Sequence, residues 1–264
     1  MRSLFSRLFR RPELTSAQRD AIATALPWIA RMPDDDRERL FVLAARFVAD
    51  KAITPLHDLA FDEDRRVLLA ALACLPLLRF GEQGLAGWTE VVVYPGAFRV
   101  HRRHHDEDTG VVAEWHEELA GESWDRGPLI LSWDDVEADL AEPHAGYQLV
   151  AHEMAHKLDA LDGVMDGTPP LPAAWQREWA RDFQQAYEAF CARVDAGEET
   201  PIDAYAAEAP EEFFAVTTEY HFSDPALLAR EMPAVASHLL RFYGPSPITE
   251  ARSGKRGQCM INRA

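Results

Sequence analysis

The sequence predicts a mixed α+β fold, because blocks of helical and strand-like pattern follow one another along the chain. Apolar residues recur at helical spacing over residues 15–80. Two short runs rich in β-branched and aromatic residues come next, at 88–94 and 127–133. Helical patterns return from residue 147 to residue 243. We therefore expect a small β-sheet with a helical N-terminal layer and a helical C-terminal part.

The N-terminal layer is predicted from capping signals and periodicity. Ser16 is suited to cap a first helix, and the aspartates at 34–36 mark a polar joint before the next one. Beyond this joint, Leu40 and Phe47 share one helical face. Residues 1–14 are basic and lack the apolar stretch and cleavage site of an export signal, so we expect them to form a flexible tail.

The middle of the chain contains the predicted strands. The first, at 88–94, ends at Pro95-Gly96, and the second occupies 127–133. The pattern at 111–115 is compatible with a further strand. Residues 101–108 are rich in His and Asp, and we expect them to form a solvated loop rather than a metal site.

The remaining segments are predicted to be helical. Residues 147–161 contain neither Gly nor Pro and are followed by Gly163, which is typical of a helix with a glycine C-terminal cap. The later helical segments lie at 175–194, 211–222 and 225–243. Pro233 should divide the last of these, because proline cannot continue a helical hydrogen-bond ladder.

The composition excludes several classes of protein. A formal charge of −17 and a pI of about 5.0 oppose attraction to nucleic acid phosphates. The three cysteines are widely separated, which indicates free thiols rather than a disulfide framework or a thiolate zinc site. No apolar stretch is long enough to span a membrane. We therefore expect a cytoplasmic protein that neither binds nucleic acid directly nor crosses a membrane.

The run His-Glu-Met-Ala-His at 152–156 predicts a metal site. Residues four apart share one face of a helix, so His152 and His156 can present two imidazoles to one ion. Two neutral imidazoles suit zinc, which acidifies a bound water. Glu153, offset towards the edge of that face, is the natural general base. The sequence therefore indicates a zinc hydrolase with one ion per chain.

A catalytic zinc site needs a third protein ligand, and three carboxylates compete for that position. Asp159 follows on the same helix, whereas Glu212 and Glu219 lie on one face of the later helix at 211–222. Spacing alone does not choose among them.

Several motifs together resemble the Mlc titration factor A family of zinc peptidases. The two strongest are His-Glu-Met-Ala-His-Lys-Leu-Asp at 152–159 and the stretch from Ile-Asp-Ala-Tyr to Thr-Thr-Glu-Tyr at 202–220. The resemblance extends to Val-Val-Val-Tyr-Pro-Gly-Ala-Phe at 91–98, Gly-Pro-Leu-Ile-Leu-Ser-Trp at 127–133 and Ala-Cys-Leu-Pro-Leu-Leu at 73–78. It covers roughly residues 15–245.

The resemblance implies roles for individual residues. It implies that Glu212 is the third zinc ligand and that Tyr205 is a catalytic tyrosine. A phenol can stabilise the oxyanion that forms when a carbonyl is attacked. Asp159 and Glu219 are then candidates to accept hydrogen bonds from the zinc-binding imidazoles, whose second N–H usually finds such a partner.

The resemblance also implies a fold and two functions. We expect a gluzincin-like domain at 15–245, with a helical layer at 15–80, strands and metal-binding helix at 88–163 and C-terminal helices at 174–245, followed by a variable tail at 246–264. The first function is aminopeptidase-like cleavage of peptides by a zinc metallopeptidase. The alternative is a binding protein that sequesters a transcriptional repressor of the Mlc type.

Overall fold

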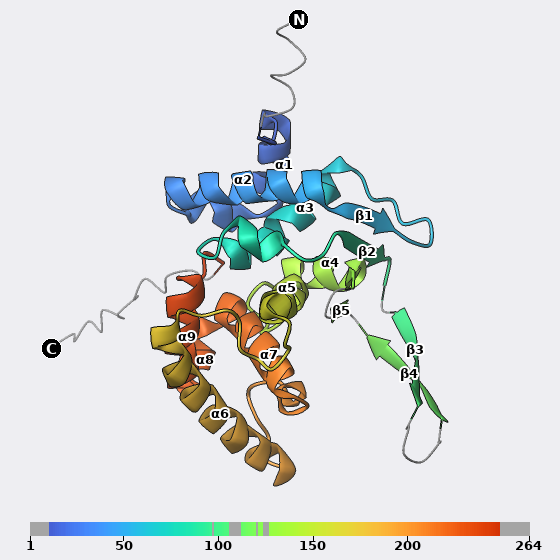
Figure 1. The fold of residues 1–264 in the computed structure, drawn as a ribbon. Coiled ribbons are helices and arrows are strands. Elements are labelled where there is room, and N and C mark those ends of the chain that lie inside the picture. Colours follow the sequence, from blue (N-terminus) through green and yellow to red (C-terminus); the bar gives the residue numbers. More distant parts are fainter. Residues whose placement is uncertain (1–10, 97, 106–111, 120, 124–126, 249–264) are drawn as a thin grey trace, which may run out of the picture.

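The computed structural model describes residues 11–96, 98–105, 112–119, 121–123 and 127–248. The N-terminal helices lie at one end and helices α6 to α9 at the other, with the sheet and helices α4 and α5 between them (Figure 1). The class is α+β, as predicted. Helix α5, which carries the His-Glu-Met-Ala-His run, thus lies in the central layer.

Three helices form the N-terminal layer: α1 (Ser16–Ala25), α2 (Asp34–Asp50) and α3 (Glu63–Cys74). The cap of α1 is Thr15, one residue before the predicted one. Its hydroxyl accepts from the Gln18 N–H while the Gln18 side chain accepts from the Thr15 N–H. Helix α3 is buried along most of its length, because it packs against α1, α2 and α5.

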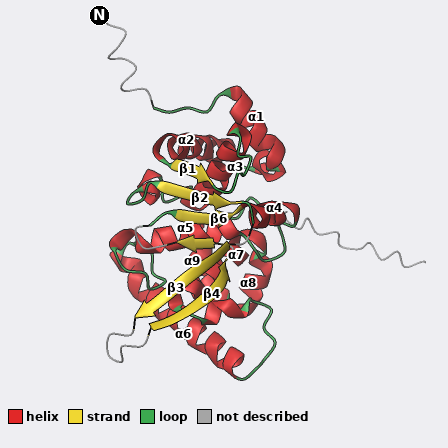
Figure 2. Cartoon of the chain, turned by 90° about the vertical axis from the view of Figure 1, so that its right-hand side faces the viewer, coloured by secondary structure: helices red, strands yellow, loops and turns green. Residues whose placement is uncertain are grey.

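The main sheet has the strand order β1-β2-β6-β5 (Figure 2). Strands β1 (Ala52–Pro55), β2 (Glu90–Tyr94) and β6 (Leu129–Ser132) are parallel, and β5 (Gly121–Ser123) pairs antiparallel with β6. The strands predicted at 88–94 and 127–133 are confirmed with shorter bounds. Strand β1 was not predicted, because its four residues are too few to show a period of two inside a helical region.

A two-stranded antiparallel hairpin, β3 (Phe98–His105) and β4 (Val112–Leu119), lies beside the main sheet (Figures 1 and 2). The expected loop at 101–108 is therefore wrong for residues 101–105, whose backbone pairs with β4 although the sequence is polar. Residues 106–108 lie outside the described part. Residues 112–115 of the strand suggested at 111–115 belong to β4, and residue 111 lies outside the described part.

Apart from the first, the helices after the sheet follow the prediction closely. They are α4 (Trp133–Ala141), α5 (Leu149–Asp159), α6 (Ala173–Asp195), α7 (Pro210–Ser223), α8 (Pro225–Glu231) and α9 (Pro233–Tyr243). Pro233 begins α9 and so separates it from α8, as predicted. Helix α4 was not anticipated, since it starts within the residues assigned to the second strand, where Ser132 accepts from the Asp135 N–H as its cap.

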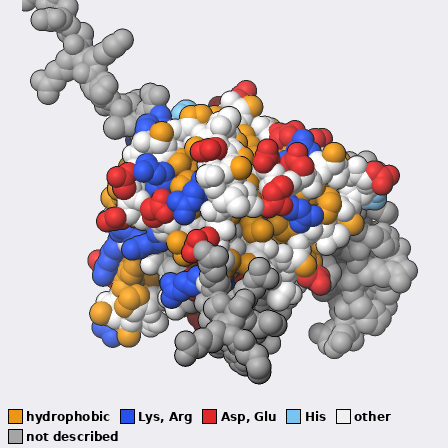
Figure 3. Space-filling model, turned by 90° about the horizontal axis from the view of Figure 1, so that it is seen from above, with side chains coloured by type: hydrophobic (Ala, Val, Ile, Leu, Met, Phe, Trp, Pro, Cys, Tyr) orange, Lys and Arg blue, Asp and Glu red, His pale blue; other side chains and the backbone are white. Residues whose placement is uncertain are grey.

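Both ends of the described chain are packed. Leu14 and Ile248 are 7% and 2% exposed, so the core includes residues that were assigned to the tails. Residues 1–10 and 249–264 of those tails lie outside the described part. Among the described helices, none is long and apolar enough to cross a membrane. Acidic, basic and apolar side chains are interspersed on the face shown in Figure 3.

Candidate metal centre

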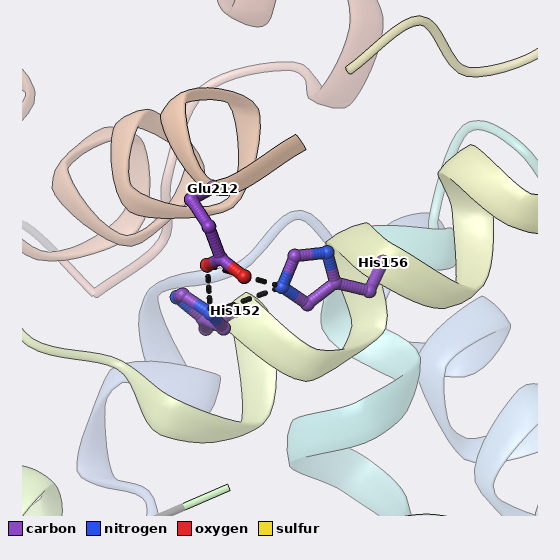
Figure 4. A group of neighbouring side chains, drawn as sticks. All are labelled: His152, His156 and Glu212. Atoms are coloured by element: carbon purple, nitrogen blue, oxygen red, sulfur yellow. Dashed lines mark hydrogen bonds and ion pairs between the residues drawn. The ribbon is translucent and has the colours of Figure 1, made fainter. Parts of the chain in front are cut away.

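Two helices bring together three side chains that can ligate a metal ion: His152 and His156 from α5, and Glu212 from α7 (Figure 4). The Nε2 atoms of the two histidines are 3.1 Å apart. Oε2 of Glu212 lies 3.2 Å from Nε2 of His152 and 3.4 Å from Nε2 of His156. The three ligand atoms therefore form a nearly equilateral triangle.

This triangle fits a small tetrahedral cation. Ligands held about 2.1 Å from an ion such as zinc lie roughly 3.4 Å from one another. Oε2 of Glu212 is buried and has no hydrogen-bond partner among the described residues, which is costly for a carboxylate unless a cation is bound. The geometry and the orphaned oxygen both favour a metal ion at this point.

Local sequence explains why the three groups meet. His152 and His156 are four residues apart on α5, so their rings lie one turn apart on the same face. Glu212 lies in the first turn of α7, which begins with Pro210, a residue preorganised for the first helical position. Helices α5 and α7 pack directly against each other, and this contact places the carboxylate opposite the imidazoles.

Glu219 holds the first histidine. Its Oε1 accepts a hydrogen bond from Nδ1 of His152 at 2.8 Å, and its Oε2 accepts from the Gln148 N–H at 2.8 Å. A proton on Nδ1 leaves the lone pair of Nε2 directed at the other ligands. Glu219 also ties the beginning of α5 to α7, so one carboxylate sets both the tautomer and the position of the ring.

Glu153 follows His152 directly on α5 and is buried, with only 2% of its surface exposed. Its Oε2 has no hydrogen-bond partner among the described residues. Burial raises the pKa of Glu153 to about 8; the charges of Glu212 and Glu219 add to the shift, while His152 and Lys157 oppose it. A carboxyl group with a raised pKa next to a metal site is suited to take up and release a proton near neutral pH.

The electrostatics of the ligands reflect their close approach. Burial alone would raise the pKa of Glu212, but the two imidazoles, whose Nε2 atoms lie 3.2 and 3.4 Å from its Oε2, outweigh burial and hold the pKa well below its usual range. For His152 burial would lower the pKa, and the carboxylates of Glu212 and Glu219 raise it instead. His152 and Glu212 thus stabilise each other's charged forms.

Asp159 has a different position from Glu219. It is completely buried, and its Oδ2 accepts from the Gly167 N–H at 2.8 Å. Burial raises the pKa of Asp159 to about 7. Gly167 in turn lies against the start of α7, where an added Cβ would come within 2.4 Å of the Pro210 carbonyl oxygen. Asp159 therefore connects the end of α5 to the turn that abuts the helix bearing Glu212.

Tyr205 lies at the open side of the site, in the short 3-10 helix η5 (Ala204–Ala207). Its ring stacks against that of His152 with centroids 6.3 Å apart, and the residue is 43% exposed. Its backbone N–H donates to Oδ1 of Asp203 at 2.9 Å. The tyrosine is thus close to the ligands and accessible to an incoming molecule.

Two further groups support the site without having been singled out from the sequence. Oδ2 of Asp139 accepts from the Leu149 N–H at 2.6 Å, at the first turn of α5. Gln148 donates its N–H to Glu219, as described above. Neither residue belongs to a recognisable motif, and only the packing of α4 and α7 around the start of α5 reveals their roles.

Two imidazoles from one helix, a carboxylate from a later helix and a buried glutamate beside them form the kind of site that metallopeptidases use. The whole sequence agrees with this class. Residues 2–244 match the model of the glucose-regulated metallo-peptidase M90 family, and the chain belongs to this family.

The chain is also similar to proteins named Mlc titration factor A. It is 37% identical over 229 residues to that of Serratia proteamaculans (strain 568), covering 86% of each chain. It is 37% identical over 235 residues to that of Cronobacter sakazakii (strain ATCC BAA-894), covering 87% of each. With that of Escherichia coli O9:H4 (strain HS) it shares 35% over 242 residues, 88% of this chain and 90% of the relative. These similarities confirm the family that the sequence motifs predicted.

Proposed function

We propose that the protein is a zinc-dependent peptidase of the gluzincin type that removes residues from the amino end of short peptides. His152, His156 and Glu212 would hold the ion, and Glu153 and Tyr205 would act on the substrate. The single observation that carries this proposal is the triangle of ligand atoms with a buried glutamate at its side.

Each protein group has a distinct chemical role. When bound, zinc supplies a Lewis acid that polarises the scissile carbonyl and lowers the pKa of water. Glu153 takes a proton from the attacking water and later gives it to the leaving amine. Tyr205, exposed beside His152, donates a hydrogen bond to the oxyanion. Glu219 keeps the His152 ring oriented throughout.

The test combines metal content with turnover. Wild type, Glu153→Gln and the control Glu211→Gln are assayed for zinc by elemental analysis and for hydrolysis of a panel of aminoacyl and N-blocked peptide amides. We expect about one zinc per chain in all three, with turnover abolished only in Glu153→Gln. Cleavage of N-blocked substrates alone would refute the aminopeptidase assignment. A wild type that takes up no zinc when supplied with it would refute the metal site.

A second function is favoured by the relatives, whose name refers to titration of Mlc. We propose that this chain also sequesters a transcriptional repressor of that type. Its net charge of −17 would complement the basic face of a DNA-binding protein. Pull-down with a purified repressor, using wild type and Glu153→Gln, separates the functions. Equal retention by both proteins supports binding independent of catalysis, and no retention at micromolar concentration rejects this second function.

A further inference from the structure

Helix α7 contacts the site through Tyr220 as well as through Glu212 and Glu219. Tyr220 is 5% exposed, and its hydroxyl donates to the Pro201 carbonyl oxygen at 3.3 Å. Burial raises the pKa of Tyr220 to about 12, and the nearby backbone of Asp203 opposes part of that shift. The phenol therefore joins α7 to the turn that leads into Tyr205.

Two further hydrogen bonds hold this turn, residues 201–207: one lies within the turn and one at its C-terminal end. Oδ1 of Asp203 accepts from the Tyr205 N–H at 2.9 Å, which starts η5. The hydroxyl of Tyr187 donates to the Ala207 carbonyl oxygen at 3.3 Å, at the end of η5. Residues 201–207 are thus attached to α7 at their beginning and to α6 at their end.

The Tyr220 ring lies against the backbone of Gly146. Gly146, with φ of +95°, lies so close that an added Cβ would come within 2.8 Å of the ring. Two residues later Gln148 donates to Glu219, the neighbour of Tyr220 on α7. The ring is therefore held between the segment that enters α5 and the turn that carries Tyr205, so it relates the position of Tyr205 to that of His152.

We propose that Tyr220 and Asp203 are positioning residues that hold the Tyr205 ring over His152. This inference rests on the proposed role of Tyr205 as the oxyanion donor. Tyr205 is 43% exposed, and the backbone turn that carries it is one restraint on where its ring lies. A hydrogen-bond donor is effective only when it is held within about 0.5 Å of its productive place.

The experiment uses the full chain loaded with zinc and five single variants. Tyr220→Phe removes only the buried hydroxyl, and Asp203→Ala removes the acceptor of the Tyr205 N–H. Tyr243→Phe is the matched control, because Tyr243 is 4% exposed and its hydroxyl pairs with Thr218 of the same helix α7. Asp162→Ala is the matched control for Asp203→Ala, because Asp162 accepts a hydrogen bond from the Val164 N–H just as Asp203 accepts one from the Tyr205 N–H. Tyr205→Phe completes the set.

Turnover gives the first readout. Tyr205→Phe should lower kcat by roughly 10²–10³-fold, the usual loss for one oxyanion donor. Tyr220→Phe and Asp203→Ala should each lower kcat about tenfold with KM within about twofold, while both controls stay within about twofold. In the Tyr205→Phe background the same two substitutions should cost less than about twofold, because they act through the missing hydroxyl.

Fluorine NMR of fluorotyrosine-labelled protein gives a readout that does not need turnover. The chain has six tyrosines, and the Tyr205 signal is assigned by its loss in Tyr205→Phe. It should move towards the value of an unstructured tyrosine in Tyr220→Phe and Asp203→Ala but not in the controls. An unchanged Tyr205 signal, or fully additive losses of kcat, would overturn the inference. A signal that moves while Tyr205→Phe keeps full kcat would support positioning and instead refute the proposed role of Tyr205.

Discussion

Nδ1 of His152 lies 2.8 Å from Oε1 of Glu219, a residue 67 positions further along the chain. The same carboxylate accepts from the Gln148 N–H at the start of α5. Glu219 therefore controls two things at once, the tautomer of a ligand and the docking of the helix that carries it. Helix α7 thus supplies both the carboxylate that orients His152 and the side chain of Glu212, which could ligate a metal ion together with the two histidines.

Replacing Glu219 with Gln should weaken metal binding without abolishing it. The amide retains an acceptor for one of the two N–H groups but loses the charge that favours the Nδ1–H tautomer of His152. We expect zinc affinity to fall about ten- to a hundredfold. Competition with a coloured chelator measures this, with the exposed Glu142→Gln as control. An affinity equal to that of the control would contradict the role of Glu219.

Replacing Glu212 with Ala should remove the metal altogether. The triangle then keeps only two imidazoles, which is too few to hold a catalytic zinc ion against a chelator. Glu211→Ala is the matched control, because Glu211 is the neighbouring acidic residue in the first turn of α7. Elemental analysis after dialysis against a mild chelator should find zinc in the control alone. Full zinc content in Glu212→Ala would show that another residue completes the site.

Gly167→Ala should disturb the metal centre from a distance. The new Cβ would lie 2.4 Å from the Pro210 carbonyl oxygen, so the first turn of α7, with Glu212, has to shift. Gly163→Ala is the control, since Gly163 also has positive φ but nothing within 4 Å of the added Cβ. The control should cost about 1 kcal/mol in free energy of unfolding.

For Gly167→Ala we expect a cost of about 3 kcal/mol, together with weaker zinc binding. Urea denaturation of the metal-free variants and chelator competition measure the two effects. Equal losses in Gly163→Ala and Gly167→Ala would mean that only backbone strain matters and that the contact with Pro210 does not.

Asp159 should make the metal-free protein less stable as the pH rises. Burial raises its pKa to about 7 in the folded chain, whereas an unfolded aspartate titrates near 3.9. Between about pH 4 and pH 7 the folded state therefore keeps a proton that the unfolded state has released, so the free energy of unfolding falls across this window.

Asp159→Asn removes this titration and should gain stability relative to wild type between pH 4 and pH 8, on the order of 4 kcal/mol. Urea denaturation at both pH values measures the difference. The exposed Asp162→Asn serves as the control and should show no such change. A difference between Asp159→Asn and wild type that is the same at both pH values would contradict the prediction.

Local pattern was sufficient for most of the helices and for the two central strands. The division of α8 from α9 follows directly from the covalent chemistry of Pro233. Pattern failed where an element was short or polar. Strand β1 has only four residues. Residues 101–105 of β3 are all His or Arg, and they form a strand only by pairing with β4. Pairing partners distant in sequence are invisible to local propensity.

The candidate site divides in the same way. His152 and His156 could be identified from the sequence, because the helical period alone brings residues four apart to one face. The choice among Asp159, Glu212 and Glu219 could not be derived from spacing, because it depends on how α7 docks on α5. In the folded chain Glu212 meets the imidazoles, Glu219 meets Nδ1 of His152, and Asp159 meets the backbone of Gly167.

By itself, then, the sequence determined the helix that carries the motif, the class of chemistry and the family. The tertiary structure showed that Glu212 meets the two imidazoles, that Glu219 contacts Nδ1 of His152 and that the Tyr205 ring lies against that of His152. The physical reason is the distance along the sequence over which each kind of interaction acts. Helical geometry acts within a few residues, whereas the contacts of Glu219 and Tyr220 join segments that only the packing of α5, α7 and η5 brings together.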